Sequence, residues 1–303
     1  MSILVVGSVA FDSVETPFGK VEDALGGSGT YFSTAASHIS EVSLVAVVGE
    51  DFPEEHIEML RKRGVNVDGV ERVKGGKTFR WKGRYDYDLN QAHTLDTQLN
   101  VFSDFNPTLP KGCEDLPFVF LANIDPELQL RVLDQVKSPR LVACDTMNFW
   151  IEGKPEALRR LFKRVDLVVI NESEAREFAG EASLVKAARA ILELGPRALI
   201  VKRGEYGSLM FNGTSVFSAP AYPLEDIYDP TGAGDSFAGG LMGYLANTDD
   251  LSEDNMRRAI IFGSVMASFN VEAFSLDRLG TLGIEEIRSR YREFKRLTHF
   301  EDL

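Results

Sequence analysis

The sequence predicts an α/β fold with a mostly parallel central sheet, helices on both faces and a small antiparallel β lid. Short apolar runs, such as residues 3–6 and 165–170, alternate with amphipathic stretches, such as residues 126–136, which is the order of β-α-β units. From about residue 65 to residue 102 period-2 patterns replace this alternation, as in antiparallel strands with one wet face. We therefore expect one domain over residues 1–303, with a lid formed by about 11–25 and 65–102.

The composition excludes several classes of protein. With 303 residues, of which 44% are hydrophobic and 26% charged, the chain matches ordinary globular proteins and can bury a large core. Its formal charge of −13 argues against a nucleic-acid or anionic-membrane partner, because both need clustered Lys and Arg. No uncharged apolar run approaches the roughly 18 residues of a membrane span. An anionic substrate would therefore need a local site.

The cysteines and histidines indicate the cellular environment and exclude further classes of enzyme. Cys113 and Cys144 have neither metal-ligand nor C-x-x-C spacing, and no signal peptide is recognised, so we expect a reducing, cytoplasmic environment. The four histidines form no H-E-x-x-H motif, and G-x-S-x-G is absent. The motifs typical of zinc hydrolases and serine hydrolases are therefore missing, which argues against both classes.

The first quarter of the chain begins with a buried strand at residues 2–9, which Gly7 and Ser8 end. The cluster at residues 26–29 opens a helix whose small residues, 35–37, let it lie close to a neighbouring backbone or ligand. A strand at 43–48 and a helix at 53–63 continue the alternation.

The lid is predicted from residues 79–87 and 95–101, where apolar and polar side chains alternate. An edge extension of the main sheet is the alternative. Arg80 and Arg84 lie on the polar side of this pattern, and we expect each of them to meet water rather than substrate.

The rest of the chain returns to alternating strands and helices. We expect strands at 118–122, 141–144, 165–170 and 197–202, a hairpin at 208–211 and 216–218, and helices at 126–136, 155–164, from 171, from 235, 255–269 and 284–297.

The stretch at residues 229–240 carries the clearest chemistry. Its four glycines and two acids read as a tight loop running into an amphipathic helix. Free N–H groups at such a helix start attract an anion, and Asp235 is either an ordinary capping acid or a general base beside that anion site. The stretch is neither a dinucleotide fingerprint, because Phe237 replaces the last Gly or Ala, nor a P-loop, because no Lys-Ser or Lys-Thr follows.

This stretch resembles the C-terminal signature of the PfkB carbohydrate kinases, the ribokinase-like family, whose pattern is D-T-x-G-A-G-D. Pro230 replaces the more usual Thr. The resemblance implies a ribokinase-like fold, with Asp235 as catalytic base and Gly232, Ala233 and Gly234 as the anion hole for the transferring phosphoryl group.

The resemblance also implies an acceptor side. Gly26 and Gly27 match the family's G-G-x-G motif and Asp12 its sugar-binding Asp, while Tyr31 stands where the family often has Asn. The Tyr31 ring could stack on a sugar face or a base. Asp145 and Asn148 follow a strand end and are further acceptor candidates. Without the resemblance, a simple turn is the more common role for Gly26 and Gly27, and a turn or capping role fits Asp145 and Asn148 at least as well. For Asp12 the structural and the functional interpretation are even.

A nucleotide and metal side follows from three more motifs. Asn171 and Glu174 match N-x-x-E, which in the family orders Mg²⁺ through its waters, although capping explains them alone. Gly204 and Gly207 match the nucleotide turn, with Lys202 as a neighbour. Parts of the family bind a monovalent cation, K⁺, at the positions of Asp229 and Thr231.

Together these motifs imply an ATP-dependent, Mg²⁺-dependent kinase that phosphorylates a hydroxyl of a small sugar or nucleoside. Two alternatives remain open. One is an inactive ligand-binding or regulatory protein of the same fold, and the other is a dehydrogenase, which the missing dinucleotide fingerprint disfavours. Several family members dimerise through the lid, so a homodimer is expected on the same resemblance.

Overall fold

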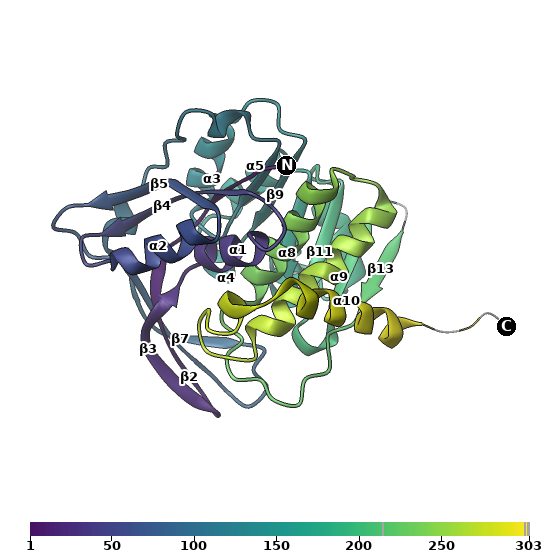
Figure 1. Ribbon diagram of the computed structural model, residues 1–303. Helices are drawn as coiled ribbons and strands as arrows, with labels where there is room; N and C mark the ends of the chain where they lie inside the picture. The colour runs from purple at the N-terminus through teal and green to yellow at the C-terminus, as the bar shows by residue number, and fades with distance from the viewer. Residues whose placement is uncertain (214, 300, 302–303) are drawn as a thin grey trace.

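The structure is a computed structural model that describes residues 1–213, 215–299 and 301. Within these residues nine strands form the central sheet, in the order β13-β12-β11-β10-β9-β8-β1-β4-β5 (Figure 1). Its strands are β1 (Ile3–Val6), β4 (Val42–Gly49), β5 (Val65–Val73), β8 (Phe118–Leu121), β9 (Leu141–Asp145), β10 (Leu167–Asn171), β11 (Ala198–Lys202), β12 (Ser208–Asn212) and β13 (Val216–Ala219). From β5 to β11 all neighbours run parallel, and β11, β12 and β13 are antiparallel. The predicted mostly parallel sheet and its terminal hairpin are confirmed.

Helices cover both faces of this sheet because its strands are apolar on both sides. One face packs against α1 (Ser28–Ala36), α2 (Glu54–Lys62), α8 (Ala233–Thr248), α9 (Glu253–Asn270) and α10 (Ile284–Thr298). The other packs against α3 (Pro126–Leu133), α4 (Asn148–Gly153), α5 (Pro155–Phe162), α6 (Glu172–Ala179) and α7 (Leu184–Leu192). Within the described part of the chain, no helix has the length and hydropathy that a bilayer span needs.

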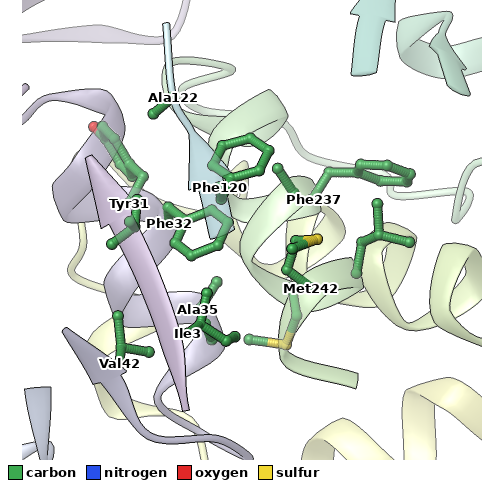
Figure 2. Close-up of a cluster of buried hydrophobic side chains, with 14 of the residues drawn as sticks. Ile3, Tyr31, Phe32, Ala35, Val42, Phe120, Ala122, Phe237 and Met242 are labelled. Atoms are coloured by element: carbon green, nitrogen blue, oxygen red, sulfur yellow. The ribbon is translucent and has the colours of Figure 1, made fainter. Parts of the chain in front are cut away.

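The core between β8, α1 and α8 fixes where the glycine-rich stretch ends up. The rings of Phe32 and Phe120 stack with their centroids 4.5 Å apart, and Phe237 and Met242 of α8 close the cluster (Figure 2). Because Phe237 lies one turn after the start of α8, this packing holds the first turn of that helix at the carboxyl edge of the sheet.

The lid is a separate sheet, so it is not an edge extension of the main one. Its order is β3-β2-β6-β7, with β2 (Ala10–Thr16), β3 (Gly19–Gly26), β6 (Phe79–Tyr85) and β7 (Ala92–Gln98). The predicted lid segment 65–102 was too long. Its first strand, β5, pairs in parallel with β4 because Val65 and Val67 are buried in the main core, and Asn100–Asp104 forms a 3-10 helix. The lid is also not purely antiparallel, since β2 and β6 run parallel.

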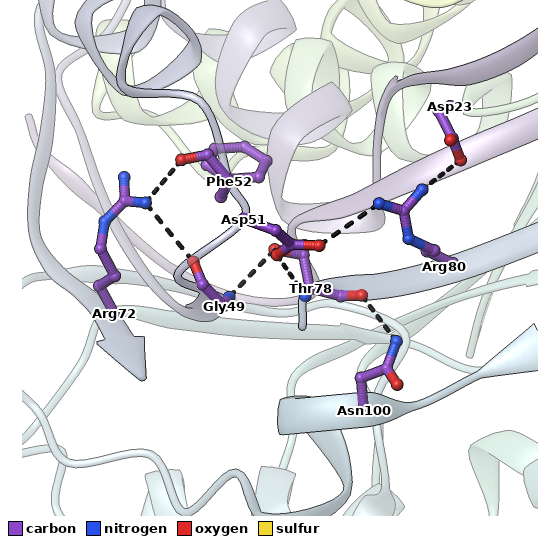
Figure 3. Close-up of polar contacts among 8 residues, drawn as sticks. All are labelled: Asp23, Gly49, Asp51, Phe52, Arg72, Thr78, Arg80 and Asn100. Atoms are coloured by element: carbon purple, nitrogen blue, oxygen red, sulfur yellow. Dashed lines mark hydrogen bonds and ion pairs between the residues drawn. The ribbon is translucent and has the colours of Figure 1, made fainter. Parts of the chain in front are cut away.

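A polar network anchors the lid to the main sheet (Figure 3). The fully buried Thr78 donates from its N and Oγ1 to Asp51 Oδ1 at 2.7 Å, and its hydroxyl accepts from Gly49 N at 3.0 Å. Arg80 pairs with Asp51 at 3.3 Å and with Asp23 of β3. The expectation that Arg80 meets only water was therefore wrong, because its guanidinium is taken up by two carboxylates.

Candidate active site

The candidate residues meet where the parallel strands end. Asn171 and Lys202 are paired in register as the last residues of β10 and β11, and Asp145 ends β9. Two helices, α6 and α8, begin at the same edge. Ligands of open α/β sheets bind at this carboxyl edge, so the fold brings the predicted phosphoryl and metal motifs together.

The glycine turn enters α8 through Gly232, whose φ of 74° lies in the left-handed region that favours glycine. Ser236 N donates to Gly232 O at 2.8 Å. A buried side chain, Asn270, ties the turn down: its Nδ2 donates to Thr231 O at 2.7 Å, and its Oδ1 accepts from Ser236 Oγ at 2.9 Å. No sequence pattern points to Asn270, which lies at the end of α9.

Asp235 stands in the first turn of α8. Burial, reinforced by Asp145 and opposed by Lys202, raises the pKa of Asp235 to about 7. A carboxyl group with a pKa near neutrality holds its proton loosely enough to exchange it at physiological pH. The N-cap residue is Gly232, which has no side chain to cap the helix, and the Asp235 carboxylate accepts a hydrogen bond from its own backbone N–H. This placement is compatible with the capping interpretation and with the general-base interpretation.

Lys202 and Asp145 form a buried ion pair, with Nζ and Oδ2 2.8 Å apart. Burial opposes the charge of Lys202, but Asp145, Glu174 and Asp235 outweigh it and raise the pKa of the ammonium. Asp145, expected on the acceptor side, is thus paired with Lys202, which was expected beside the nucleotide turn. Asn148 is exposed at the start of α4, and within the described residues no contact joins it to the acceptor candidates.

Asn171 and Glu174 form a complete capping box. Asn171 Oδ1 accepts from Glu174 N at 2.8 Å, and Glu174 Oε2 accepts from Asn171 N at 2.9 Å. Burial is the main reason that the pKa of Glu174 rises to about 7, and the nearby Lys202 works against it. The capping interpretation therefore holds, and it also places a buried carboxylate beside the phosphoryl turn.

On the acceptor side, Asp12 Oδ2 accepts from Gly27 N at 3.3 Å, and a methyl group at Gly26 would lie 1.9 Å from the same oxygen. Burial, moderated by the Gly27 N–H, raises the pKa of Asp12 to about 7. The buried Tyr31 is near enough to Asp12 and Asp235 for both carboxylates to affect its hydroxyl. The acceptor and phosphoryl candidates therefore lie close together in the structure.

Two lid residues reach this region although they had not been singled out as site residues. Tyr85, at the end of β6, lies with its hydroxyl 3.4 Å from Thr231 Oγ1. Asn90 lies against the nucleotide turn: a methyl group at Gly204 would come within 2.0 Å of Asn90 Oδ1. The lid therefore touches both the phosphoryl turn and the nucleotide turn.

The two remaining candidate motifs are turns held by backbone contacts. Gly204 and Gly207 flank a 3-10 turn with φ of 55° and 82°. The buried Asp229 accepts from Thr231 N at 2.9 Å and from Ser275 N at 3.3 Å. The positive φ values explain the two glycines of the first turn, and the two accepted backbone bonds explain Asp229 in the second.

Comparison with known proteins adds independent findings. The family model described as "pfkB family carbohydrate kinase" matches residues 2–278. The cytidine kinase of Thermococcus kodakarensis is 31% identical over 250 residues, which are 80% of this chain and 88% of that protein. The nucleoside kinase of Methanothermobacter thermautotrophicus is 26% identical over 286 residues, 89% of each chain.

Among solved structures, the nucleoside kinase of Methanocaldococcus jannaschii, described as an archaeal member of the ribokinase family, shares the fold. The two superpose with a TM-score of 0.76 and 20% identity, over 96% of this chain and 98% of that one. The ribokinase-like fold expected from the motifs is confirmed, and the matched residues include every candidate site position.

Proposed function

The chain belongs to the pfkB family of carbohydrate kinases, and from this premise we propose that it transfers the γ-phosphate of ATP to a hydroxyl of a nucleoside. Its membership makes it a phosphotransferase with a hydroxyl acceptor of the sugar and nucleoside class. One observation carries the catalytic part of the proposal. The half-buried Asp235, whose carboxyl pKa is raised to about 7, lies in the first turn of the helix that the glycine turn enters.

In the proposed reaction the acceptor oxygen attacks the γ-phosphorus in line with the leaving oxygen. Asp235 accepts the proton of the attacking hydroxyl. The bond between the γ-phosphorus and the bridging oxygen breaks, and ADP leaves with its electron pair. The amides of Gly232, Ala233 and Gly234 donate to the phosphoryl oxygens at the N-terminus of α8, where the helix dipole favours negative charge.

The chain's oxygen donors fit Mg²⁺ at the edge formed by Asn171 and Glu174. Glu174 Oε2 serves the capping box, which leaves Oε1 for a metal-bound water. Among the described residues, no group of three or more His, Cys, Asp or Glu side chains builds a metal site, which suits an ion held through waters and phosphates. When bound, Mg²⁺ supplies charge neutralisation on the phosphates.

The remaining residues divide into an acceptor and a nucleotide group. Asp12 would accept hydrogen bonds from sugar hydroxyls, next to the turn at Gly26 and Gly27. The backbone of Gly204 and Gly207 would approach ATP, with Lys202 between this turn and the phosphates.

A nucleoside is proposed as acceptor because two relatives that this chain matches over most of their length are a cytidine kinase and a nucleoside kinase. The aromatic residues Tyr31, which is buried, and Tyr85, which is half-buried, both lie near Asp12 and agree with a ligand that has a flat ring. A sugar is the second candidate.

An ADP-release screen tests the function. Purified protein is incubated with ATP, Mg²⁺ and single nucleosides, sugars or sugar phosphates, with Asp235→Asn as blank. We expect turnover with a nucleoside and none in the blank. If none of the acceptors in the panel causes ADP release although the protein binds ATP, the result favours the inactive ligand-binding alternative.

Three further expectations stay predictions. K⁺ at Asp229 and Thr231 is tested by replacing K⁺ with Na⁺ or a bulky organic cation, and unchanged activity contradicts it. A homodimer through the lid suits β7, an edge strand that is exposed along its whole length, and light scattering tests it. The cytoplasmic location is tested by cell fractionation.

A further inference from the structure

The ion pair of Lys202 and Asp145 is more deeply buried than the ion pairs on the protein surface. The two side chains come from β11 and β9 and meet across the end of β10, with exposed fractions of only 19% and 5%. Burying two charges gains little stability, because desolvation cancels most of their attraction. A reason for placing this pair under the phosphoryl turn has to come from elsewhere.

The position of the ammonium supplies that reason. A methyl group at Gly234 would lie 2.9 Å from Lys202 Nζ, so the ammonium is in contact with the turn proposed to hold the phosphoryl group. Within the described residues Nζ donates to Asp145 alone. An ammonium has three protons, and two of them are therefore free for a ligand.

The negative charges around the ammonium are a second reason for its position. Asp145, Glu174 and Asp235 are all near enough to act on Lys202. A transferring phosphoryl group would bring further negative charge to the same place. Charge that develops during transfer is stabilised best by donors that are already fixed in position.

We propose that Lys202 is a catalytic residue whose ammonium binds the γ-phosphoryl group as it passes over Gly234, and that Asp145 is the positioning residue that holds the ammonium there. This inference rests on the proposed function and goes beyond a simple nucleotide contact. It assigns Asp145 to the phosphoryl group rather than to the acceptor.

The first test needs no acceptor. ADP and the non-hydrolysable AMP-PNP, each with Mg²⁺, are titrated by calorimetry into the wild type and Lys202→Met. We expect the variant to bind ADP as the wild type does and to lose about tenfold or more of its preference for AMP-PNP, because only AMP-PNP carries the γ-phosphoryl group. The rate of transfer to an accepted substrate should fall by about 100- to 1,000-fold, the usual loss for one such donor.

The second test is the pH profile of kcat/KM, which shows whether the two charges act on Asp235 in the working enzyme. Asp145→Asn removes a negative charge near Asp235 and should shift the acidic limb to lower pH, while Lys202→Met removes a positive charge and should shift it to higher pH. The ionisable groups that act on Asp235 or are acted on by it are Asp145 from β9, Lys202 from β11, Asp12 from β2, Tyr31 from α1 and Tyr85 from β6.

Matched controls come from a second ion pair, Lys154 and Asp125, whose Nζ and Oδ2 are 2.5 Å apart and which joins the end of α4 to the start of α3. Lys154→Met should leave the AMP-PNP preference and the pH profile unchanged. Where Lys202→Met alone does not fold, the double variant with Asp145→Asn removes both charges and takes its place.

A folded variant without the ammonium that keeps the wild-type AMP-PNP preference overturns the inference, and so does an acidic limb that Asp145→Asn leaves in place. The proposed function fails separately. In that case the wild type prefers AMP-PNP through Lys202 and yet phosphorylates no acceptor.

Discussion

The ring of Tyr31 lies flat against the backbone of Gly232. Three of its atoms, Cγ, Cδ1 and Cδ2, would each be 2.4 Å from a methyl group at that glycine. Since Gly232 also has a φ of 74°, both the turn conformation and the aromatic contact require a residue without a side chain. The contact joins the acceptor helix α1 to the phosphoryl turn.

Gly232→Ala should therefore cost both stability and activity. We expect a loss of about 1–3 kcal/mol in the free energy of unfolding, from backbone strain and overpacking, and a larger relative loss in kcat because the turn is displaced. Urea denaturation and ADP release measure the two effects. Gly153→Ala is the control, because that glycine has open space around it and no positive φ. Equal behaviour of the two variants would contradict the role of the contact.

The raised pKa of Asp235 predicts the pH dependence of activity. A base works only when deprotonated, so with a pKa of about 7 kcat/KM should fall as the pH drops below neutrality. Asp235→Asn should abolish turnover at every pH while ATP binding persists. An activity that stays constant from about pH 5 to 8 would exclude Asp235 as the titrating base.

The same shift predicts an effect on stability with a definite sign. Folding raises the pKa of Asp235 from its ordinary value of 3.8 to about 7. Its contribution to stability is therefore present below the unfolded pKa and is lost as the pH rises through the folded pKa. Near pH 8 the ionised carboxylate destabilises the fold by up to about 4 kcal/mol, at 1.36 kcal/mol per pKa unit. Asp235→Asn should therefore raise Tm near pH 8 and change it little near pH 4. A variant less stable than the wild type at pH 8 would contradict this.

Sequence reasoning could single out candidate site residues because their motifs are local. The phosphoryl turn, the N-x-x-E box and the glycine pairs each depend on residues a few positions apart, and turn and capping chemistry makes such patterns readable. Parallel strands end at one edge, and in the structure this brings Asn171, Lys202 and Asp145 together. From the sequence, Asp145 was expected on the acceptor side and Lys202 beside the nucleotide turn.

What the sequence could not predict depends on tertiary contacts. Asn270 acts on Ser236 across 34 residues and Asp145 on Lys202 across 57, and no local pattern records such pairings. The lid boundary was wrong for a related reason. The polar positions of β5 suggested a lid strand, but which sheet a strand joins is decided by burial of Val65 and Val67. The short helices α4 and α7 were also not predicted.

Asn270 gives a prediction about support of the turn. Asn270→Ala removes its bonds to Thr231 and Ser236, and the buried partners left unsatisfied should cost about 1–3 kcal/mol. Because the lost bonds hold the phosphoryl turn, kcat per folded molecule should fall as well. The matched control is Asn255→Ala on the same helix.

Asn255 is also buried, and its Nδ2 donates to Thr248 and Asp250 at the other end of α9. Its replacement should cause a similar loss of stability and leave kcat per folded molecule intact. If both variants lose stability and neither loses kcat, Asn270 is only a core residue.

The lid anchor predicts how water is excluded from the reaction. Arg80 holds the lid through Asp51 and Asp23, and its guanidinium lies 4.6 Å over the ring of Phe11. Arg80→Met should loosen the lid, raise KM for the acceptor by roughly tenfold and increase ATP hydrolysis relative to transfer, because a closed site keeps water from the phosphoryl group. Arg84→Met is the control. Arg84 is half-exposed, and its ion pair with Asp86, at 3.9 Å, is a long contact at the surface that contributes little. Parallel assays of ADP and phosphorylated product give the ratio. A ratio that is unchanged in Arg80→Met, or that rises equally in Arg84→Met, would show that the anchor does not control access of water to the site.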